Sequence, residues 1–178
     1  MLIKFFPHST TYDNEAGIAT GSVEVALSPL GKIQVSNLKN AIANEKFDAV
    51  FSSDLSRAIE TAEGALGDRN KIFVDERLRE INIGDFSRKV SCFPHSFAFQ
   101  HINSPFPGGE SYKDVENCIK SFLSDISKTY SQKRIAIFGH QAPQLALEVI
   151  TKKVPWEEAI KSDWRNTKSF QYGWEYAF

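Results

Sequence analysis

Short apolar runs alternate with amphipathic stretches along this chain, and the alternation predicts its secondary structure. Runs of four or five mainly apolar residues have the length of buried strands; they cover 2–6, 48–51, 71–74 and 135–138. Apolar residues that recur every three or four positions predict helices with one buried face; they cover 30–42, 55–66, 112–130 and 142–150. Residues 8–27 and 75–107 show neither period and are expected to be mostly loops.

Local signals place some of the helix ends. Ser28 is followed by Pro29, the pair typical of a helix N-cap and the first helical position, and Gly67 is a typical C-terminal stop. In the helix after Ser28 the pattern predicts one apolar face, made of Leu30, Ile33, Leu38, Ala41 and Ile42.

Strands that alternate with helices predict an α/β fold, with a largely parallel sheet between two helical layers. At about 150 residues per domain, the 178 residues are expected to form a single domain over residues 1–178. The tail beyond Val154 holds all three tryptophans and is expected to pack back on the body.

Polar side chains follow the predicted strands, at the sheet edge where α/β proteins bind ligands. His8 follows the first strand, and Arg57 lies in the first helical turn after the second. Glu80 lies in the loop after the third strand, and His140 and Gln141 come after the fourth. Two imidazoles, an arginine and a carboxylate could therefore meet at one edge.

Composition narrows the partners of such a site. Lys and Arg number 21 against 22 Asp and Glu, a formal net charge of −1. With this balance the protein has no overall positive electrostatic field that would attract nucleic acid or an anionic membrane. An anionic ligand would therefore need a local cluster of positive groups. The start of the chain does not resemble a signal peptide, and Cys92 and Cys118 are expected to be reduced thiols. We therefore expect a cytoplasmic protein, and the sequence leaves its oligomeric state open, a homodimer included.

The residue types suit phosphoryl transfer. An imidazole can form a covalent phosphohistidine, and the planar guanidinium of Arg57 matches a phosphate. Backbone N–H groups near Ser53 and Gln141 could add to an anion site, and the carboxyl group of Glu80 could protonate a leaving alkoxide. This chemistry requires neither a metal nor another cofactor.

The ordered motifs resemble the histidine phosphatase superfamily, also called phosphoglycerate mutase-like. The family begins with a strand and Arg-His-Gly, with Asn six residues past the His; this chain has Pro7-His8-Ser9 and Asn14. Further matching segments run in the family's order from Leu2 to about Ile150; they are Ser53 to Ala62, Arg77 to Glu80, Pro107 to Ser111 and Phe138 to His140.

The resemblance implies an α/β/α sandwich and a role for each matching residue. His8 would be the phosphorylated nucleophile, and Arg57 and His140 would bind the phosphoryl group. Glu80 would act as acid and then as base. Asn14 would assist, and we add Ser9 and Gln141 as candidates for binding phosphate or substrate. The resemblance implies a phosphatase for a small phosphorylated metabolite.

The chain departs from the family pattern beside the nucleophile. Pro7 stands where the family has an arginine, and Ile18 replaces a basic position of the mutase branch. Loss of one desolvated guanidinium contact costs about 2–4 kcal/mol in the transition state. Substitute cations could come from three places in the chain, Lys4, Arg79 or Arg165.

Two other functions stay open. Pro7 favours a degenerate protein that binds a phosphorylated ligand with little or no turnover. A metal hydrolase would use His8, His140, Asp54 and Glu80, but these lack the short helical spacing usual for zinc.

Aromatic residues mark the stretch 86–107, which the resemblance places over the site; they are Phe86, Phe93, Phe97, Phe99 and Phe106. Most are expected to form core, but any that line the pocket would favour a substrate with an apolar group. His95 and His101 are expected to be structural or surface residues.

Overall fold

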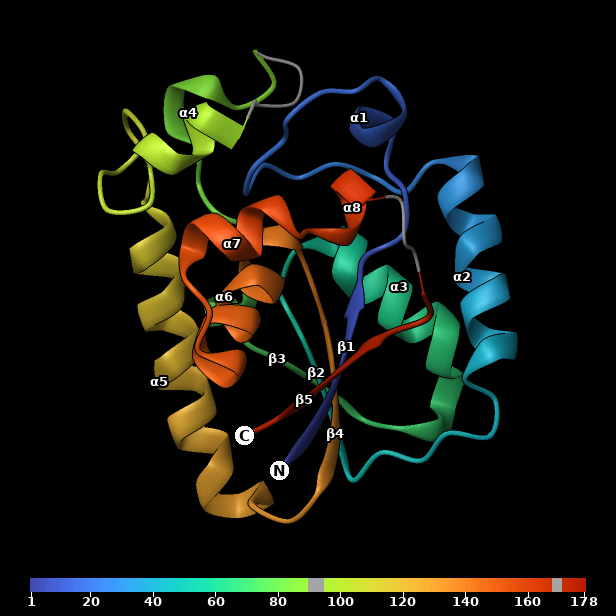
Figure 1. The fold of residues 1–178 in the computed structure, drawn as a ribbon. Helices are drawn as coiled ribbons and strands as arrows, with labels where there is room; N and C mark the ends of the chain where they lie inside the picture. The colour runs from blue at the N-terminus through green and yellow to red at the C-terminus, as the bar shows by residue number, and fades with distance from the viewer. Residues whose placement is uncertain (90–94, 168–170) are drawn as a thin grey trace.

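The computed structural model describes residues 1–89, 95–167 and 171–178. Within these ranges a five-stranded sheet, in the order β3-β2-β4-β1-β5, lies between two layers of helices (Figure 1). The pairs β2–β3, β2–β4 and β1–β4 are parallel, and β5 pairs antiparallel with β1. The strands are β1 (Leu2–Pro7), β2 (Ala49–Ser52), β3 (Ile72–Val74), β4 (Arg134–Gly139) and β5 (Trp174–Ala177).

The helices vary from single turns to five turns. The longer ones are α2 (Pro29–Ala41), α3 (Ser56–Leu66), α5 (Tyr112–Tyr130) and α6 (Gln141–Lys152). The shorter ones are α1 (Tyr12–Glu15), α4 (His95–Gln100), α7 (Trp156–Lys161) and α8 (Trp164–Thr167). Single 3₁₀ turns cover Gly67–Arg69, Glu76–Leu78 and Gly84–Phe86. None of the helices in the described ranges is long and apolar enough to cross a bilayer.

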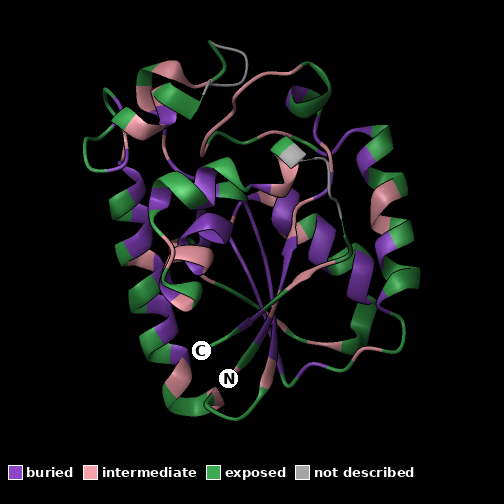
Figure 2. Ribbon diagram, viewed as in Figure 1, coloured by how far each residue is buried: buried purple, intermediate pink, exposed green. Residues whose placement is uncertain are grey.

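Strand alternation divides the apolar residues between the two faces of the sheet. Ile3 and Phe5 of β1 pack in the cluster that includes α5 and α6, whereas Phe6 packs in the cluster that includes α2 and α3. The central strands are therefore buried on both sides (Figure 2). This confirms the α/β sandwich with a largely parallel sheet.

The parallel register between β1 and β4 brings two histidines together. Pro7, the last residue of β1, is paired with Gly139, the last residue of β4. The next residues are His8 and His140, and the backbone N–H of His8 donates to the carbonyl of Gly139 at 2.9 Å. The two histidines are therefore neighbours at the carboxyl edge of the sheet.

The four strands and four longer helices predicted from the sequence are confirmed, and Ser28 is the N-cap of α2. The predicted apolar face of α2 is confirmed at Leu38 and at Ile42, which follows the helix, and is wrong at Leu30, Ile33 and Ala41. Leu30 and Ile33 are 45% and 60% exposed, while Gly31 and Leu38 are buried. The helix approaches the carbonyl of Thr10 at Gly31, where an added Cβ would lie 2.0 Å from the oxygen. This close approach sets which side of the helix faces inward.

Regions expected to be loops contain the short helices α1 and α4. The tail beyond Val154 packs on the body as expected: Trp156 is 5% exposed, and β5 extends the sheet. Cys118 is a free thiol, and Cys92 and Phe93 lie outside the described residues.

Candidate active site

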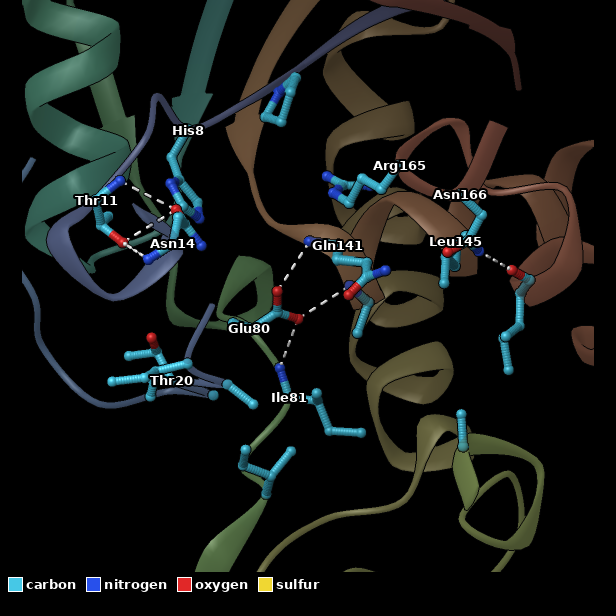
Figure 3. Close-up of a pocket in the computed structure, with 18 of the residues that line it drawn as sticks. His8, Thr11, Asn14, Thr20, Glu80, Ile81, Gln141, Leu145, Arg165 and Asn166 are labelled. Atoms are coloured by element: carbon cyan, nitrogen blue, oxygen red, sulfur yellow. Dashed lines mark hydrogen bonds between the residues drawn. The ribbon is translucent and has the colours of Figure 1, made fainter. Parts of the chain in front are cut away.

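A cavity of about 460 Å³ opens at the carboxyl edge of the sheet (Figure 3). It brings together side chains from β1, α1, α3, the loop after β3, α6 and the tail. Of the residues predicted for the site, those that line it are His8, Asn14, Arg57, Glu80 and Gln141. Pro7 also lines it, and so does Arg165 of the tail.

His8 is held as a neutral imidazole with one free nitrogen. Its Nδ1 lies 2.8 Å from the carbonyl oxygen of Ser9, and because a carbonyl can only accept, Nδ1 carries the proton. Burial, followed by the positive charge of Arg57, lowers the pKa of His8 to about 3. At neutral pH Nε2 therefore keeps its lone pair, which is what a nucleophile needs.

His140 is fully buried beside His8, with 5.1 Å between the ring centroids. Its Nε2 lies 2.6 Å from Oγ of Ser53, and that oxygen also accepts the N–H of Leu55 at 3.1 Å. The Ser53 hydroxyl can thus donate to Nε2, which puts the imidazole proton on Nδ1. Among the described residues Nδ1 of His140 has no hydrogen-bond partner. His140 is 0% exposed and is not among the residues that line the cavity, so it lies directly behind His8. Burial, followed by the neighbouring imidazole of His8 and the charge of Arg57, holds the pKa of His140 well below its usual value.

Arg57 is 2% exposed and lies in the first turn of α3. Nη1 donates to the carbonyl of Val23 at 2.8 Å, and Nη2 donates to that of Gly21 at 2.9 Å. A guanidinium has five N–H donors, and three of those of Arg57 have no hydrogen-bond partner among the residues that the structure describes. Burial lowers the pKa of Arg57, and the charge of Glu80 opposes that effect.

Glu80 caps the start of α6. Its Oε1 accepts the N–H groups of Ile81 and Ala142 at 3.0 and 2.9 Å, and its Oε2 accepts that of Gln141 at 2.9 Å. The N–H groups that we expected near Gln141 for an anion are therefore already used by this carboxylate. Within the described ranges Oε2 accepts one hydrogen bond, which leaves it a position that can carry a proton.

Asn14 and Ser9 have different places. Asn14 is exposed at the cavity, and its Oδ1 accepts from Thr11 in the capping box of α1. This leaves the amide NH₂ as a donor. Ser9 is buried and does not line the cavity; its N–H donates to Oγ1 of Thr61 at 3.0 Å. The contribution of Ser9 is thus its carbonyl, which orients His8.

Of the three basic residues considered as substitutes for an arginine at Pro7, Arg165 lines the cavity. Lys4 forms an ion pair with Glu45. Arg79 donates from Nε to Asp54 at 2.7 Å in a two-point ion pair, and it lines a neighbouring cavity.

The apolar wall of the cavity comes from aliphatic residues and from two aromatic residues, Tyr112 and Trp164. The large aliphatic side chains in this wall are Ile18, Ile81, Ile83, Leu145 and Ile160. The described phenylalanines of the stretch 86–107 belong to the core or pack against it, as expected for most of them. Phe86, Phe97 and Phe106 contact one another. His101 stacks on Phe106 with 3.9 Å between centroids, in line with a structural role, whereas His95 lines the cavity.

The arrangement does not match the metal site considered from the sequence. The carboxylate of Asp54 is paired with Arg79, and that of Glu80 caps α6. Across the described ranges, no three His, Cys, Asp or Glu side chains are grouped as metal ligands would be.

Sequence reasoning missed several residues that position the site. Ser53 and Thr61 lie in the family motif from Ser53 to Ala62. The motif therefore marked both positions, although no role for their side chains followed from the sequence. Asp163 and Gln144 contact Gln141 or Arg165, and no local pattern in the sequence marks them.

Known proteins resemble this chain in sequence and in fold. Phosphoserine phosphatase 1 of Hydrogenobacter thermophilus is 28% identical over 150 residues, which cover 79% of this chain and 71% of that protein. The alpha-ribazole phosphatase of Shigella flexneri superposes with a TM-score of 0.77 at 24% identity, over 90% of this chain and 84% of that one. A mycobacterial glucosyl-3-phosphoglycerate phosphatase complexed with VO3 superposes with a TM-score of 0.78 at 23% identity, over 89% and 83%. The two structural matches show the fold.

Residues 5–176 match the sequence model of the Histidine phosphatase superfamily (branch 1). The match reaches beyond Ile150, where the recognisable motifs end, so the tail that carries Trp164 and Arg165 belongs to the family domain. The chain is a member of the histidine phosphatase superfamily.

Proposed function

We propose that this protein hydrolyses small phosphomonoesters through a phosphohistidine at His8. The observation that carries the proposal is the state of the two imidazoles. His8 offers an unprotonated Nε2 to the cavity, and the buried Nδ1 of His140 beside it has no partner among the described residues. A nucleophile next to an unused buried donor suits attack on a phosphoryl group.

The reaction has two balanced steps. In the first, Nε2 of His8 attacks phosphorus, the ester P–O bond breaks, and the leaving alkoxide takes a proton from Glu80. In the second, water attacks phosphorus, Glu80 takes a proton from that water, and the N–P bond breaks to release phosphate and free His8. Arg57 and Nδ1 of His140 stabilise the charge on the phosphoryl oxygens in both steps.

The shape of the cavity and the family support small substrates. A volume of about 460 Å³ suits a metabolite. The relatives named above are phosphatases for phosphoserine, alpha-ribazole phosphate and glucosyl-3-phosphoglycerate by their names. The aliphatic wall next to Glu80 favours a substrate that carries an apolar portion beside its phosphate.

Binding with little turnover is the second candidate. It is favoured by Pro7, which offers no donor beside the nucleophile, and by the use of two Arg57 donors on loop carbonyls. Turnover separates the two candidates, since both predict that phosphate binds.

Labelling tests the covalent step. Protein mixed with a ³²P-labelled phosphomonoester and quenched in alkali should keep label that is stable in base and lost in acid, as expected for phosphohistidine. His8→Ala should keep none, and His101→Ala, whose histidine packs on Phe106, should label like the native protein. Label that persists in His8→Ala would assign the nucleophile to another residue.

A metal-free reaction belongs to the same proposal. Turnover should be unchanged after dialysis against a chelator, and loss of activity that zinc restores would favour the metal hydrolase. The cytoplasmic location and a homodimeric assembly stay predictions.

A further inference from the structure

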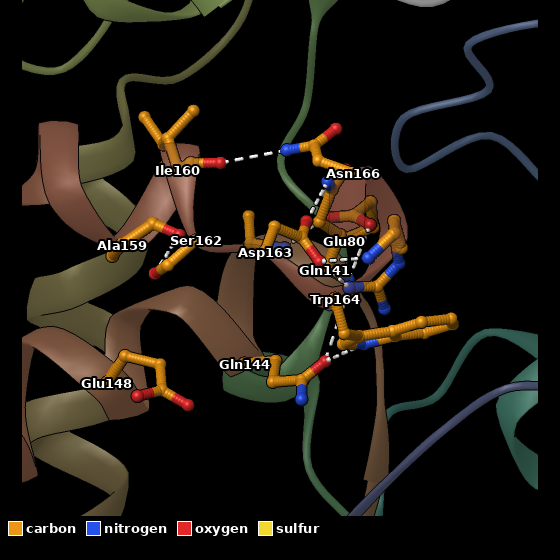
Figure 4. Close-up of polar contacts among 12 residues, drawn as sticks. Glu80, Gln141, Gln144, Glu148, Ala159, Ile160, Ser162, Asp163, Trp164 and Asn166 are labelled. Atoms are coloured by element: carbon orange, nitrogen blue, oxygen red, sulfur yellow. Dashed lines mark hydrogen bonds and ion pairs between the residues drawn. The ribbon is translucent and has the colours of Figure 1, made fainter. Parts of the chain in front are cut away.

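A polar network that includes Gln144, Asp163 and Trp164 (Figure 4) holds the guanidinium of Arg165, which lines the cavity. Nη1 of Arg165 donates to Oδ1 of Asp163 at 3.0 Å and to Oε1 of Gln144 at 3.3 Å. The same Gln144 oxygen accepts from Nε1 of Trp164 at 3.1 Å, and the other Asp163 oxygen accepts from the side chain of Gln141. The network therefore connects the start of α6 to the tail.

Asp163 is a buried carboxylate that holds Arg165 in place. It is 4% exposed, and its Oδ1 accepts both the backbone N–H and Nη1 of Arg165, each at 3.0 Å. A buried carboxylate with this many donors fixes its partner's position, because any movement would leave the charge unpaired. Arg165 is thus held in place before a ligand arrives.

The guanidinium of Arg165 lies over the Trp164 ring, 4.4 Å from its centroid, and its hydrogen bonds in this network use one end of it. Within the described ranges only Nη1 forms hydrogen bonds, so Nη2 and Nε keep their donors. Arg165 lines the cavity, and Figure 3 shows it reaching in from the side opposite His8, with Glu80 between and below them. These donors are therefore available to a ligand inside the cavity.

The positive charges of Arg165 and Arg57 both act on the two histidines of the site. Each of them lowers the pKa of His8 and of His140. The two guanidinium groups are like charges and repel each other, whereas the imidazoles are neutral, and the carboxylate of Glu80 offsets part of this repulsion at Arg57. The carboxylate of Asp163 offsets part of that repulsion from behind.

We propose that Arg165 binds the phosphate group of the substrate, as a second arginine opposite Arg57, with Asp163 and Gln144 as positioning residues that hold its guanidinium. This inference rests on the proposed function for its substrate. It assigns to the tail a direct part in the chemistry, and it accounts for the absence of an arginine at Pro7.

Phosphate and vanadate binding test this inference without requiring turnover. Dissociation constants would be measured for the native protein, Arg165→Ala and Lys161→Ala, and kcat/KM on p-nitrophenyl phosphate would be measured in parallel. Lys161 is an exposed cation of the same tail and serves as the matched control. Loss of a charge-assisted contact should weaken binding of both anions by about 10- to 150-fold in Arg165→Ala, and Lys161→Ala should stay within two-fold.

Two further measurements distinguish contact with phosphate from support of the fold. Guanidinium ion at low millimolar concentration should restore part of the kcat/KM of Arg165→Ala, and Arg165→Lys should bind phosphate better than Arg165→Ala. Asp163→Asn should weaken phosphate binding in the native background but add nothing to Arg165→Ala, because residues that act through one contact are not additive. If Arg165→Ala fails to fold by circular dichroism, Arg165→Gln replaces it.

The outcomes separate this inference from the proposed function. Anion binding that is the same in Arg165→Ala and Lys161→Ala overturns the inference, and labelling at His8 still decides the function. Unlabelled His8 together with weakened anion binding in Arg165→Ala overturns the phosphohistidine mechanism and keeps the role of Arg165. A native protein that binds neither anion overturns the inference.

Discussion

Replacement of Glu80 by Gln tests the two tasks that this side chain has in the structure. The carboxylate accepts two N–H groups on Oε1, from Ile81 and Ala142, and one on Oε2, from Gln141. The amide of Gln keeps an oxygen for the first two and places its NH₂ against the third. The variant therefore loses one hydrogen bond for folding and the proton that the leaving group needs.

The effect on stability follows from counting these bonds. One hydrogen bond contributes about 0.5–1.5 kcal/mol net, and a chain of this size loses about 2–4 °C of Tm per kcal/mol. Glu80→Gln should thus lower Tm by about 1–6 °C, at the low end because the Gln141 N–H is exposed to water. Glu80→Ala removes three bonds and should lower Tm by about 3–18 °C by the same arithmetic.

The effect on activity depends on the leaving group. A general acid contributes about 10²- to 10⁴-fold, and an alkyl phosphomonoester needs all of it because an alkoxide is a poor leaving group. Nitrophenolate leaves without a proton, so p-nitrophenyl phosphate should lose less than about ten-fold. The assay is kcat/KM on both substrates for native protein, Glu80→Gln and Glu76→Gln, an exposed glutamate nearby.

Equal losses on the two substrates would refute the acid role, because they would show that Glu80 acts through binding or position. A Tm decrease in Glu80→Gln as large as in Glu80→Ala would refute the count of hydrogen bonds. Glu76→Gln should match the native protein in both measurements.

Three more predictions concern the charges around His8. Arg57→Ala should weaken phosphate or vanadate binding by about 1.5–3 kcal/mol, measured by calorimetry, and it should also lower Tm because the loop carbonyls of Gly21 and Val23 lose their donors. Because the pKa of His8 falls from 6.5 to about 3 on folding, the unfolded chain binds this proton first as pH decreases. The contribution of the neutral His8 to stability should thus be fully present above about pH 6.5 and should be lost as the pH decreases toward 3. The pH dependence of Tm should be shallower in His8→Ala, and identical profiles for the two proteins would contradict the neutral imidazole. Pro7→Arg should give no gain in kcat/KM on p-nitrophenyl phosphate if Arg165 already supplies the charge, whereas a ten-fold gain, about 1.4 kcal/mol, would show that the contact is absent.

Much of the fold could be predicted because strong local patterns and tertiary packing agree. The helix over 112–130 is confirmed as α5 with the same bounds, since its apolar residues repeat over five turns. The face of α2 could not be read in the same way, because the close approach of Gly31 to Thr10, and not apolar content, sets it. The short helix α4 depends on contacts with α7, which no local signal encodes.

The membership of the family could also be predicted, and the match over residues 5–176 confirms it. The motifs placed His8, Arg57, Glu80 and His140 after separate strands, and a parallel sheet brings such positions to one edge whatever the side chains are. The paired ends of β1 and β4 leave the two histidines side by side.

The groups at the carboxyl edge could be predicted from the sequence, because the carboxyl ends of parallel strands meet at one edge whatever their order. How those groups are used depends on contacts between distant parts of the chain. The N–H groups of Gln141 and Ala142, at the start of α6, are occupied by Glu80. The carbonyl of Ser9 holds the proton of His8 on Nδ1 and so leaves Nε2 unprotonated. The position of Arg165 depends on Gln144, which lies 21 residues earlier in the chain. Contacts over such a separation leave no periodic pattern in the sequence.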